Sequence, residues 1–182
     1  MTNPQTFVVG DGIQSATFRL LGGVHTLVND LKIRTNALLT GCGTINGNVL
    51  VEGTVLADCG GNLVFTGTVT NNATMKAING STLEFFGPVV NNGLIDAIGG
   101  NTNFHAGVIN NGVILDSACD YDGDGMSNLQ ESLAGTDPTN NASYFHVTSI
   151  LPQGDDLLVV WSVVTNKSYI VLPASDDARL GR

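Results

Sequence analysis

The chain has 182 residues, with 7 lysines and arginines against 16 aspartates and glutamates, giving a formal net charge of −9. Seven scattered cations cannot build the basic face that displaces counterions from phosphates, so we predict that the protein does not bind nucleic acid. Charged residues make up only 13% of the chain and glycine contributes 23 residues, a combination typical of an all-β, turn-rich fold.

The sequence contains no apolar run of 18 residues, so it predicts no membrane span. Its opening stretch, MTNPQTFVVGDG, has neither the basic segment nor the apolar segment of a secretory signal. Two expectations remain open: a cytosolic protein, or a fragment of a longer exported one.

A repeat of about 20 residues dominates residues 1–118. Segments 68–87 and 88–107 align, a third copy opens at residue 108, and looser relatives lie at 48–67 and further upstream. A unit of this length cannot bury its own apolar face, and self-similarity at such a period indicates stacked units.

The aligned positions predict which side chains face the core. Large apolar residues share one position: Val55, Met75, Ile95 and Ile114. The position two residues further on also faces inward, because side chains alternate along a strand; it holds Ala57, Ala77 and Ala97. The mixed file between them is expected to face solvent and contains Leu56, Lys76, Asp96 and Leu115. Because Lys76 and Asp96 would lie one layer apart, we expect them to pair.

A second pair of inward positions holds Leu63 with Leu83 and Phe65 with Phe85. The third copy has Asn103 and His105 there instead. Either the register shifts so that Phe104 points inward, or the core ends at that layer.

Corners and asparagines repeat as well. Each repeat has a glycine-containing pair at the same place, which suits a sharp corner with positive φ. The pairs are Gly60-Gly61, Asn79-Gly80 and Gly99-Gly100. Two files of asparagine are expected to bond amide to amide from layer to layer: Asn71, Asn91 and Asn110, and beside them Asn72, Asn92 and Asn111.

Aligned identical positions predict a parallel β-helix, or solenoid, with coils of about 20 residues. The alternative is an antiparallel sandwich, whose neighbouring strands need not match in sequence. Exposed end coils would favour end-to-end association. Residues 7–118 contain stretches such as GTINGNV and VVNNGLI, and with these they resemble the β-helical passenger regions of bacterial surface proteins, including autotransporter-like ones.

Three cysteines occur, at positions 42, 59 and 119, without a C-x-x-C pair. Cys42 and Cys59 either lie in neighbouring coils and pair, or are small buried hydrophobic residues. We prefer the second interpretation, because free cysteine is often buried.

The acidic loop, residues 120–131, reads DYDGDGMSNLQE and matches the calcium-loop pattern D-x-D-x-D-G-x5-E. Carboxylates at alternate positions of a tight loop converge on one hard cation, and the glutamate closes the coordination sphere with both oxygens. The expected ligands are the side chains of Asp120, Asp122, Asp124, Asn128 and Glu131 and the backbone carbonyl of Met126. About seven oxygens suit Ca²⁺ better than Mg²⁺.

Only one helix accompanies this loop. A strand pattern precedes it, and MSNLQESLAG after it offers about two helical turns with Leu129 and Leu133 on one face and Gly135 as a C-cap. Residues 120–143, DYDGDGMSNLQESLAGTDPTNNAS, resemble the calcium-binding repeats of thrombospondin type 3 and dockerin-like proteins. The resemblance implies calcium at the loop, with Asp137 as a further candidate ligand. A single motif argues against cellulosome docking, which needs two.

Residues 143–182 show three alternating runs, near 144–150, 157–163 and 168–172, separated by turn residues. They resemble the start of a small β-sandwich module, which needs about seven strands. The sequence therefore predicts three parts: a solenoid over 1–118, a calcium loop with short helix and linker over 119–142, and an incomplete β segment over 143–182.

The coils show no catalytic motif, so we predict that the chain is not an enzyme. The expected function is a structural or adhesive segment of an exported cell-surface protein, in which calcium rigidifies the joint after the solenoid. Its partners would be calcium and a surface polysaccharide or protein ligand. The alternative is a fragment of a carbohydrate-active β-helix enzyme, a polysaccharide lyase or hydrolase, whose catalytic coils lie elsewhere.

Calcium also bears on location. Extracellular modules of this type bind at about 10⁻⁴–10⁻³ M, which cytosolic calcium could not fill. We therefore expect an extracellular or cell-surface location, although no signal peptide is visible.

Overall fold

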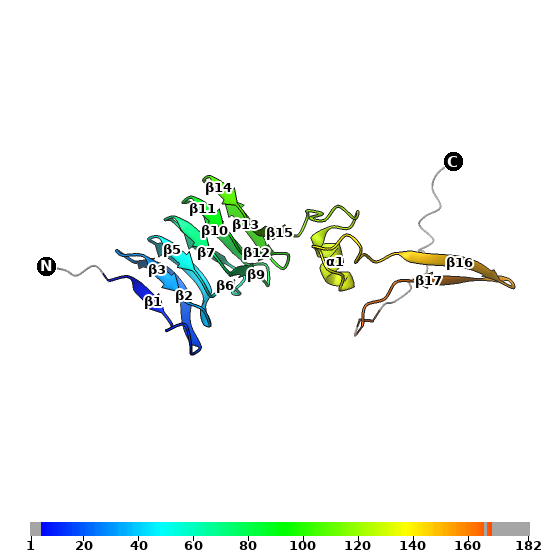
Figure 1. Ribbon diagram of the computed structural model, residues 1–182, viewed down its shortest axis with the longest axis horizontal. Coiled ribbons are helices and arrows are strands. Elements are labelled where there is room, and N and C mark those ends of the chain that lie inside the picture. The colour runs from blue at the N-terminus through cyan, green and yellow to red at the C-terminus, as the bar shows by residue number, and fades with distance from the viewer. Residues whose placement is uncertain (1–4, 166, 169–182) are drawn as a thin grey trace.

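The computed structural model describes residues 5–165 and 167–168. Its strands form a parallel β-solenoid of six coils, followed by a short helix and an antiparallel strand pair (Figure 1). The predicted fold class is therefore confirmed, and the sandwich alternative for the repeat region is wrong, because every strand pairing within it is parallel.

One face of the solenoid is a six-stranded sheet of three-residue strands. In spatial order it consists of β1 (Phe7–Val9), β3 (Leu31–Ile33), β5 (Val49–Val51), β8 (Val69–Asn71), β11 (Val89–Asn91) and β14 (Val108–Asn110).

A nine-stranded sheet forms the other two faces. One arm holds β13 (Asn101–Phe104), β10 (Thr82–Phe85) and β7 (Asn62–Phe65), and the other holds β6 (Thr54–Ala57), β9 (Thr74–Ala77), β12 (Leu94–Ala97) and β15 (Val113–Asp116). The arms meet at β4 (Ala37–Asn46), which also pairs with β2 (Ala16–Thr26).

The predicted inward files are confirmed. Met75 pairs in register with Val55 and Ile95, and Ile95 pairs with Ile114. Val55, Met75 and Ile95 are fully buried, as is Ala77 in the next inward file. Aligned parallel pairing thus places each apolar side chain over its counterpart in the coil before, and one continuous core results.

In the last coil the register shifts and Phe104 points inward, the first of the two alternatives. Phe65, Phe85 and Phe104 stack with ring centroids 5.4 and 5.1 Å apart. Stacked rings at this spacing add to the stabilisation from area burial. Asn103 and His105 face outward and both bond the Glu84 carboxylate.

Both asparagine ladders form. Asn71 donates to Asn91 and Asn91 to Asn110, each over 2.8 Å, and Asn71 and Asn91 are fully buried. The second, exposed ladder joins Asn92 to its counterparts in the adjacent coils. The Lys76 ammonium meets the Asp96 carboxylate at 2.5 Å, as predicted.

The repeated corners do not all need glycine for the same reason. Gly60, Asn79 and Gly80 have φ of 75°, 56° and 72°, as the corner prediction requires. Gly99 and Gly100 are not among the residues with positive φ. A Cβ on Gly100 would lie 2.3 Å from the Ser81 carbonyl oxygen, so close approach of the previous coil excludes a side chain there.

A disulfide joins Cys42 to Cys59, with their Cα atoms 6.0 Å apart. Our preference for two unpaired buried cysteines was wrong. Cys42 lies in β4 and Cys59 lies in the corner after β6, and the pairing of these strands brings the two residues together. Cys119 is free and exposed.

Two positions of the outward file differ from expectation. Leu115 is only 6% exposed and Asp96 only 9% exposed, although both were predicted to face solvent. The following helix, α1 (Asn128–Ala134), lies against β15. The end of this sheet is therefore covered by the segment that follows it.

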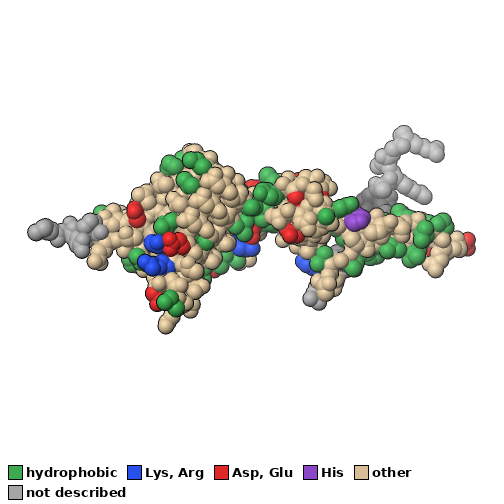
Figure 2. Space-filling model, in the orientation of Figure 1, with side chains coloured by type: hydrophobic (Ala, Val, Ile, Leu, Met, Phe, Trp, Pro, Cys, Tyr) green, Lys and Arg blue, Asp and Glu red, His purple; other side chains and the backbone are tan. Residues whose placement is uncertain are grey.

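The C-terminal strand pair consists of β16 (Val147–Gln153) and β17 (Asp156–Trp161), joined at the predicted turn. Many of its apolar side chains are exposed, and Figure 2 shows them along the hairpin. The third predicted run, near 168–172, lies almost entirely outside the described residues. Within the described ranges, no helix has the length and apolar character needed to cross a membrane.

Candidate metal centre

The acidic loop is shaped by its own aspartates. The Asp120 carboxylate accepts hydrogen bonds from the backbone N–H groups of Gly123 (2.8 Å) and Gly125 (2.9 Å). Asp122 accepts from Asp124 N–H, and Asp124 accepts from Met126 N–H. Gly123 and Gly125 have φ of 78° and 97°, so the two tight bends require residues without a side chain.

These bends gather carboxylates. Ligand oxygens of Asp120, Asp122 and Asp124 lie within 4.8 Å of one another. Four carboxylate oxygens of the loop are buried without a hydrogen-bond partner among the described residues: Asp122 Oδ2, Asp124 Oδ2 and both oxygens of Glu131. Buried carboxylate oxygens are normally paired, so the donor set fits a cation that takes oxygen ligands.

Glu131 is the most unusual of these groups. Its side chain is fully buried, and the Thr136 hydroxyl donates to its backbone carbonyl rather than to its carboxylate. Burial, followed by the nearby charges of Asp122 and Asp124, raises the pKa of this carboxyl above its ordinary value. A divalent cation would reverse both effects, because it neutralises the cluster and binds the free oxygens.

Helix α1 positions Glu131. Ser127 is its N-cap: the Ser127 hydroxyl accepts from Gln130 N–H, and the Gln130 amide oxygen accepts from Ser127 N–H. At the other end Gly135 has φ of 83° and caps the helix, as predicted. Sequence reasoning missed the cap at Ser127, although the S-x-x-Q spacing is a known start signal.

Two of the predicted ligand positions make other contacts. Asn128 is fully buried, its Nδ2 donates to the Asp116 carbonyl (2.6 Å), and its Oδ1 accepts from Tyr121 N–H (3.2 Å). Met126, expected to offer its carbonyl, accepts a hydrogen bond from Phe145 N–H at its sulfur (3.3 Å). Coordination by these two residues stays a prediction.

Asp137, the further candidate ligand, is exposed and begins a turn. Its carboxylate accepts from both the backbone N–H and the hydroxyl of Thr139, and these bonds lower its pKa. The described geometry thus accounts for its carboxylate without a metal ion.

The loop and helix also contact the segment that follows. Besides the bond from Phe145 to Met126, the Lys167 ammonium lies 3.4 Å from the carbonyl oxygens of Ser132 and Leu133 at the helix end. A cation at a helix C-terminus is favourable, because it satisfies free carbonyls there. Helix α1 and the acidic loop before it lie between the solenoid and the hairpin, as Figure 1 shows.

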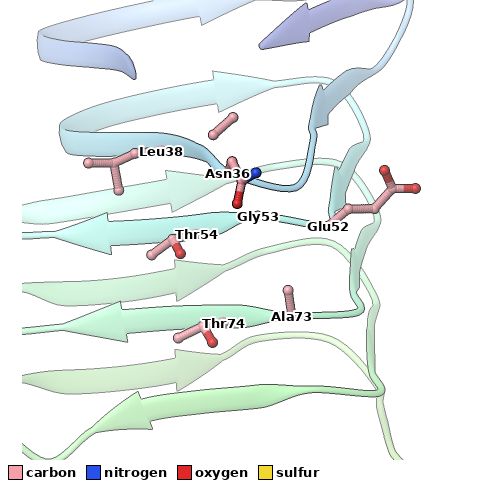
Figure 3. Close-up of a pocket in the computed structure, with 8 residues that line it drawn as sticks. Asn36, Leu38, Glu52, Gly53, Thr54, Ala73 and Thr74 are labelled. Carbon is pink, nitrogen blue, oxygen red and sulfur yellow. The ribbon is translucent and has the colours of Figure 1, made fainter. Parts of the chain in front are cut away.

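Figure 3 shows one of the shallow depressions on the outer surface of the coils. Its lining is mostly small or neutral, and its one carboxylate, Glu52, pairs with Lys32 at 2.7 Å. Glu84 and Asp96, elsewhere on the coils, are likewise held by His105 and Lys76. These three carboxylates therefore each have a basic partner, and only Glu52 lines the depression, so no second carboxylate of the described residues faces it there.

Comparison of the chain with protein-family models, with curated proteins and with solved structures finds no match.

Proposed function

We propose that this chain is a non-catalytic structural segment in which the acidic loop binds one calcium ion and thereby stiffens the joint between the solenoid and the C-terminal hairpin. The single observation that carries the proposal is the set of four buried, unpartnered carboxylate oxygens on Asp122, Asp124 and Glu131. Uncompensated carboxylates are costly to bury, and a divalent ion is the simplest group that compensates all of them.

Within this proposal the carboxylates of Asp120, Asp122, Asp124 and Glu131 hold the ion, and the Met126 carbonyl adds a neutral oxygen. Calcium supplies positive charge and a flexible oxygen coordination shell. The loop does not work as a sensor, because a β-strand rather than a helix precedes it and no helix pair can open.

The solenoid suits a stalk or a display surface. The ladder of Asn72, Asn92 and Asn111 runs along its outside with a regular spacing from coil to coil. An adhesive role would use this surface toward a polysaccharide or protein ligand. End-to-end association remains a further expectation, supported by β14, whose residues are all exposed.

One observation and one consequence of the proposed calcium site support an exported, cell-surface location. The disulfide between Cys42 and Cys59 suits an oxidising compartment. A loop with only one calcium site of this type would be filled at extracellular calcium levels.

The carbohydrate-active alternative is less well supported. Glycosidases need two free carboxyl groups about 5–10 Å apart, whereas three of the coil carboxylates, those of Glu52, Glu84 and Asp96, each have a cationic or histidine partner. Asp58, which keeps a buried oxygen without a partner in the described part of the chain, is a single group. Incubation with a panel of acidic and neutral polysaccharides, followed by assay for reducing ends, tests it; release of reducing ends would favour the enzyme.

Calorimetric titration of the chelated full chain with calcium tests the main proposal. We expect one ion per chain, with affinity reduced more than about tenfold in Glu131→Gln, because that variant loses a bidentate charged ligand. The matched control is Glu52→Gln, which removes a carboxylate from the coils and should bind calcium as wild type does. A wild-type chain that takes up no calcium at millimolar concentration would contradict the proposal.

A further inference from the structure

Asn128 lies at the boundary between the acidic loop and the last coil of the solenoid. Its Nδ2 donates to the carbonyl of Asp116, the final residue of β15, over 2.6 Å. Its Oδ1 accepts from Tyr121 N–H in the loop, and its backbone N–H donates to the Cys119 carbonyl over 2.7 Å. One fully buried side chain is thus bonded to the solenoid and to the loop at once.

The same boundary has further contacts. Leu129 N–H donates to the Ser117 carbonyl over 3.1 Å, directly beyond the end of β15. Leu115, on the outward side of β15, is 6% exposed, and helix α1 lies against this strand. The loop and helix therefore cover the end of the sheet, which in a solenoid is where a cap is needed.

Helix α1 connects this boundary to the metal centre. Asn128 begins the helix and Glu131 lies three residues on, so both project from the same face of its first turn. Both side chains are fully buried. A helix of seven residues held at Asn128 to β15 leaves Glu131 little freedom to move away from the aspartates.

We propose that the acidic loop is the C-terminal cap of the solenoid, with Asn128 as the positioning residue that couples metal binding to the order of the last coil. This inference rests on the proposed calcium site and gives Asn128 a role other than that of a ligand. Calcium binding then stabilises β15, and by thermodynamic reciprocity an ordered β15 raises the affinity for calcium.

Amide hydrogen exchange of the full chain, in calcium and in chelator, tests the coupling. We expect calcium to slow exchange of the β15 amides about tenfold in wild type. In Asn128→Asp the response should fall below about twofold, because the new side chain still accepts from Tyr121 N–H but cannot donate to the Asp116 carbonyl. Calcium affinity should fall about fivefold or more in the same variant.

The substitution also separates the two roles of Asn128. If Asn128 coordinated calcium, a carboxylate at this position would keep or raise the affinity, and that result would overturn the inference. The matched control is Asn111→Ala, which removes an asparagine of the last coil that bonds Asn92 and not the loop. It should speed exchange in that coil with and without calcium but keep the tenfold response; loss of that response would also overturn the inference.

Leu115→Ala provides a second route if Asn128→Asp does not fold. It leaves the loop unchanged and removes a covered side chain of β15, so reciprocity predicts at least threefold weaker calcium binding, and unchanged affinity would contradict the coupling. Calcium binding by wild type without any change at β15 overturns this inference and leaves the calcium site standing. Absence of calcium binding by wild type overturns both.

Discussion

Individual side chains of the acidic loop have different roles in the candidate metal centre. Asp120 uses its oxygens to bend the backbone, through Gly123 and Gly125. Asp122, Asp124 and Glu131 keep oxygens that are buried and unpartnered. The motif predicted this group of carboxylates, but only the fold shows which oxygens are left for an ion.

Glu131 should make the calcium-free protein sensitive to pH. Because its pKa is raised in the folded state, its favourable contribution is fully present below the ordinary value of 4.5 and is lost as pH rises through the raised pKa. At pH 7 in chelator, Glu131→Gln should therefore unfold with a free energy about 1–3 kcal/mol higher than wild type. Denaturant unfolding at several pH values measures the difference.

That difference should vanish when the pH falls below 4.5, where both side chains are neutral. It should reverse in saturating calcium, since wild type then gains binding free energy that the variant lacks. Equal stability of the two proteins in chelator at pH 7 would contradict the account of Glu131 as an unpaired buried carboxylate.

Asn91 offers a second prediction at the scale of one residue. Its side chain is fully buried, and its amide bonds Asn71, Asn110, the Gly93 N–H and the Val113 carbonyl. Asn91→Ala should lower the free energy of unfolding by about 2–4 kcal/mol, because several buried polar groups lose their partner.

The control is the parallel ladder outside the core. Asn92 is exposed, and its side-chain amide donates to Asn72 and accepts from Asn111 in the adjacent coils. Asn92→Ala should therefore cost less than about 1 kcal/mol. If urea unfolding gave equal losses for the two variants, the buried ladder would not have the structural role assigned to it.

Among the elements, the strands of the middle coils were the most predictable. Apolar residues recur every 20 positions there, so Val55, Met75 and Ile95 align without ambiguity. The last coil was ambiguous, because the corner before β13 is one residue shorter than the corner before β10 and a one-residue change reverses the faces of a strand. Only packing of Phe104 on Phe85 decides the register.

Met75 tests the packing of these strands. It is fully buried between Val55 and Ile95, so Met75→Ala should reduce the free energy of unfolding by about 2–5 kcal/mol through lost burial and the cavity left behind. Lys76→Ala on the outward face should cost about 1 kcal/mol or less, as expected for a partly exposed ion pair. Comparable losses in chemical denaturation would indicate that the inward file is misassigned.

For the molecule as a whole, the sequence predicted the order of solenoid, loop, helix and hairpin but not how they are fastened together. Three contacts stabilise the folded chain: the disulfide within the solenoid, the packing of helix α1 over Leu115, and the hydrogen bonds of Asn128. Each joins residues that are brought close by the fold, and none of them leaves a periodic pattern in the sequence. An asparagine at position 128 fits a ligand pattern and a buried bridge equally well until its neighbours are known.

The disulfide is testable on the whole chain. Protein exported into an oxidising compartment should present one reactive thiol per denatured chain, that of Cys119. Because the bonded cysteines lie 17 positions apart in the sequence, reduction should lower stability by about 2–4 kcal/mol. Cys119→Ser should remove the reactive thiol without changing stability; three reactive thiols in unreduced exported protein would contradict the pairing.

The most direct test of the calcium-stiffened joint is backbone ¹⁵N relaxation of the full chain, which reports how the solenoid and the hairpin β16–β17 tumble. In calcium, amides of both parts should share one rotational correlation time. In chelator, or in Asp122→Ala with calcium present, the hairpin should tumble faster than the solenoid. Identical relaxation of the hairpin with and without bound calcium would contradict the account.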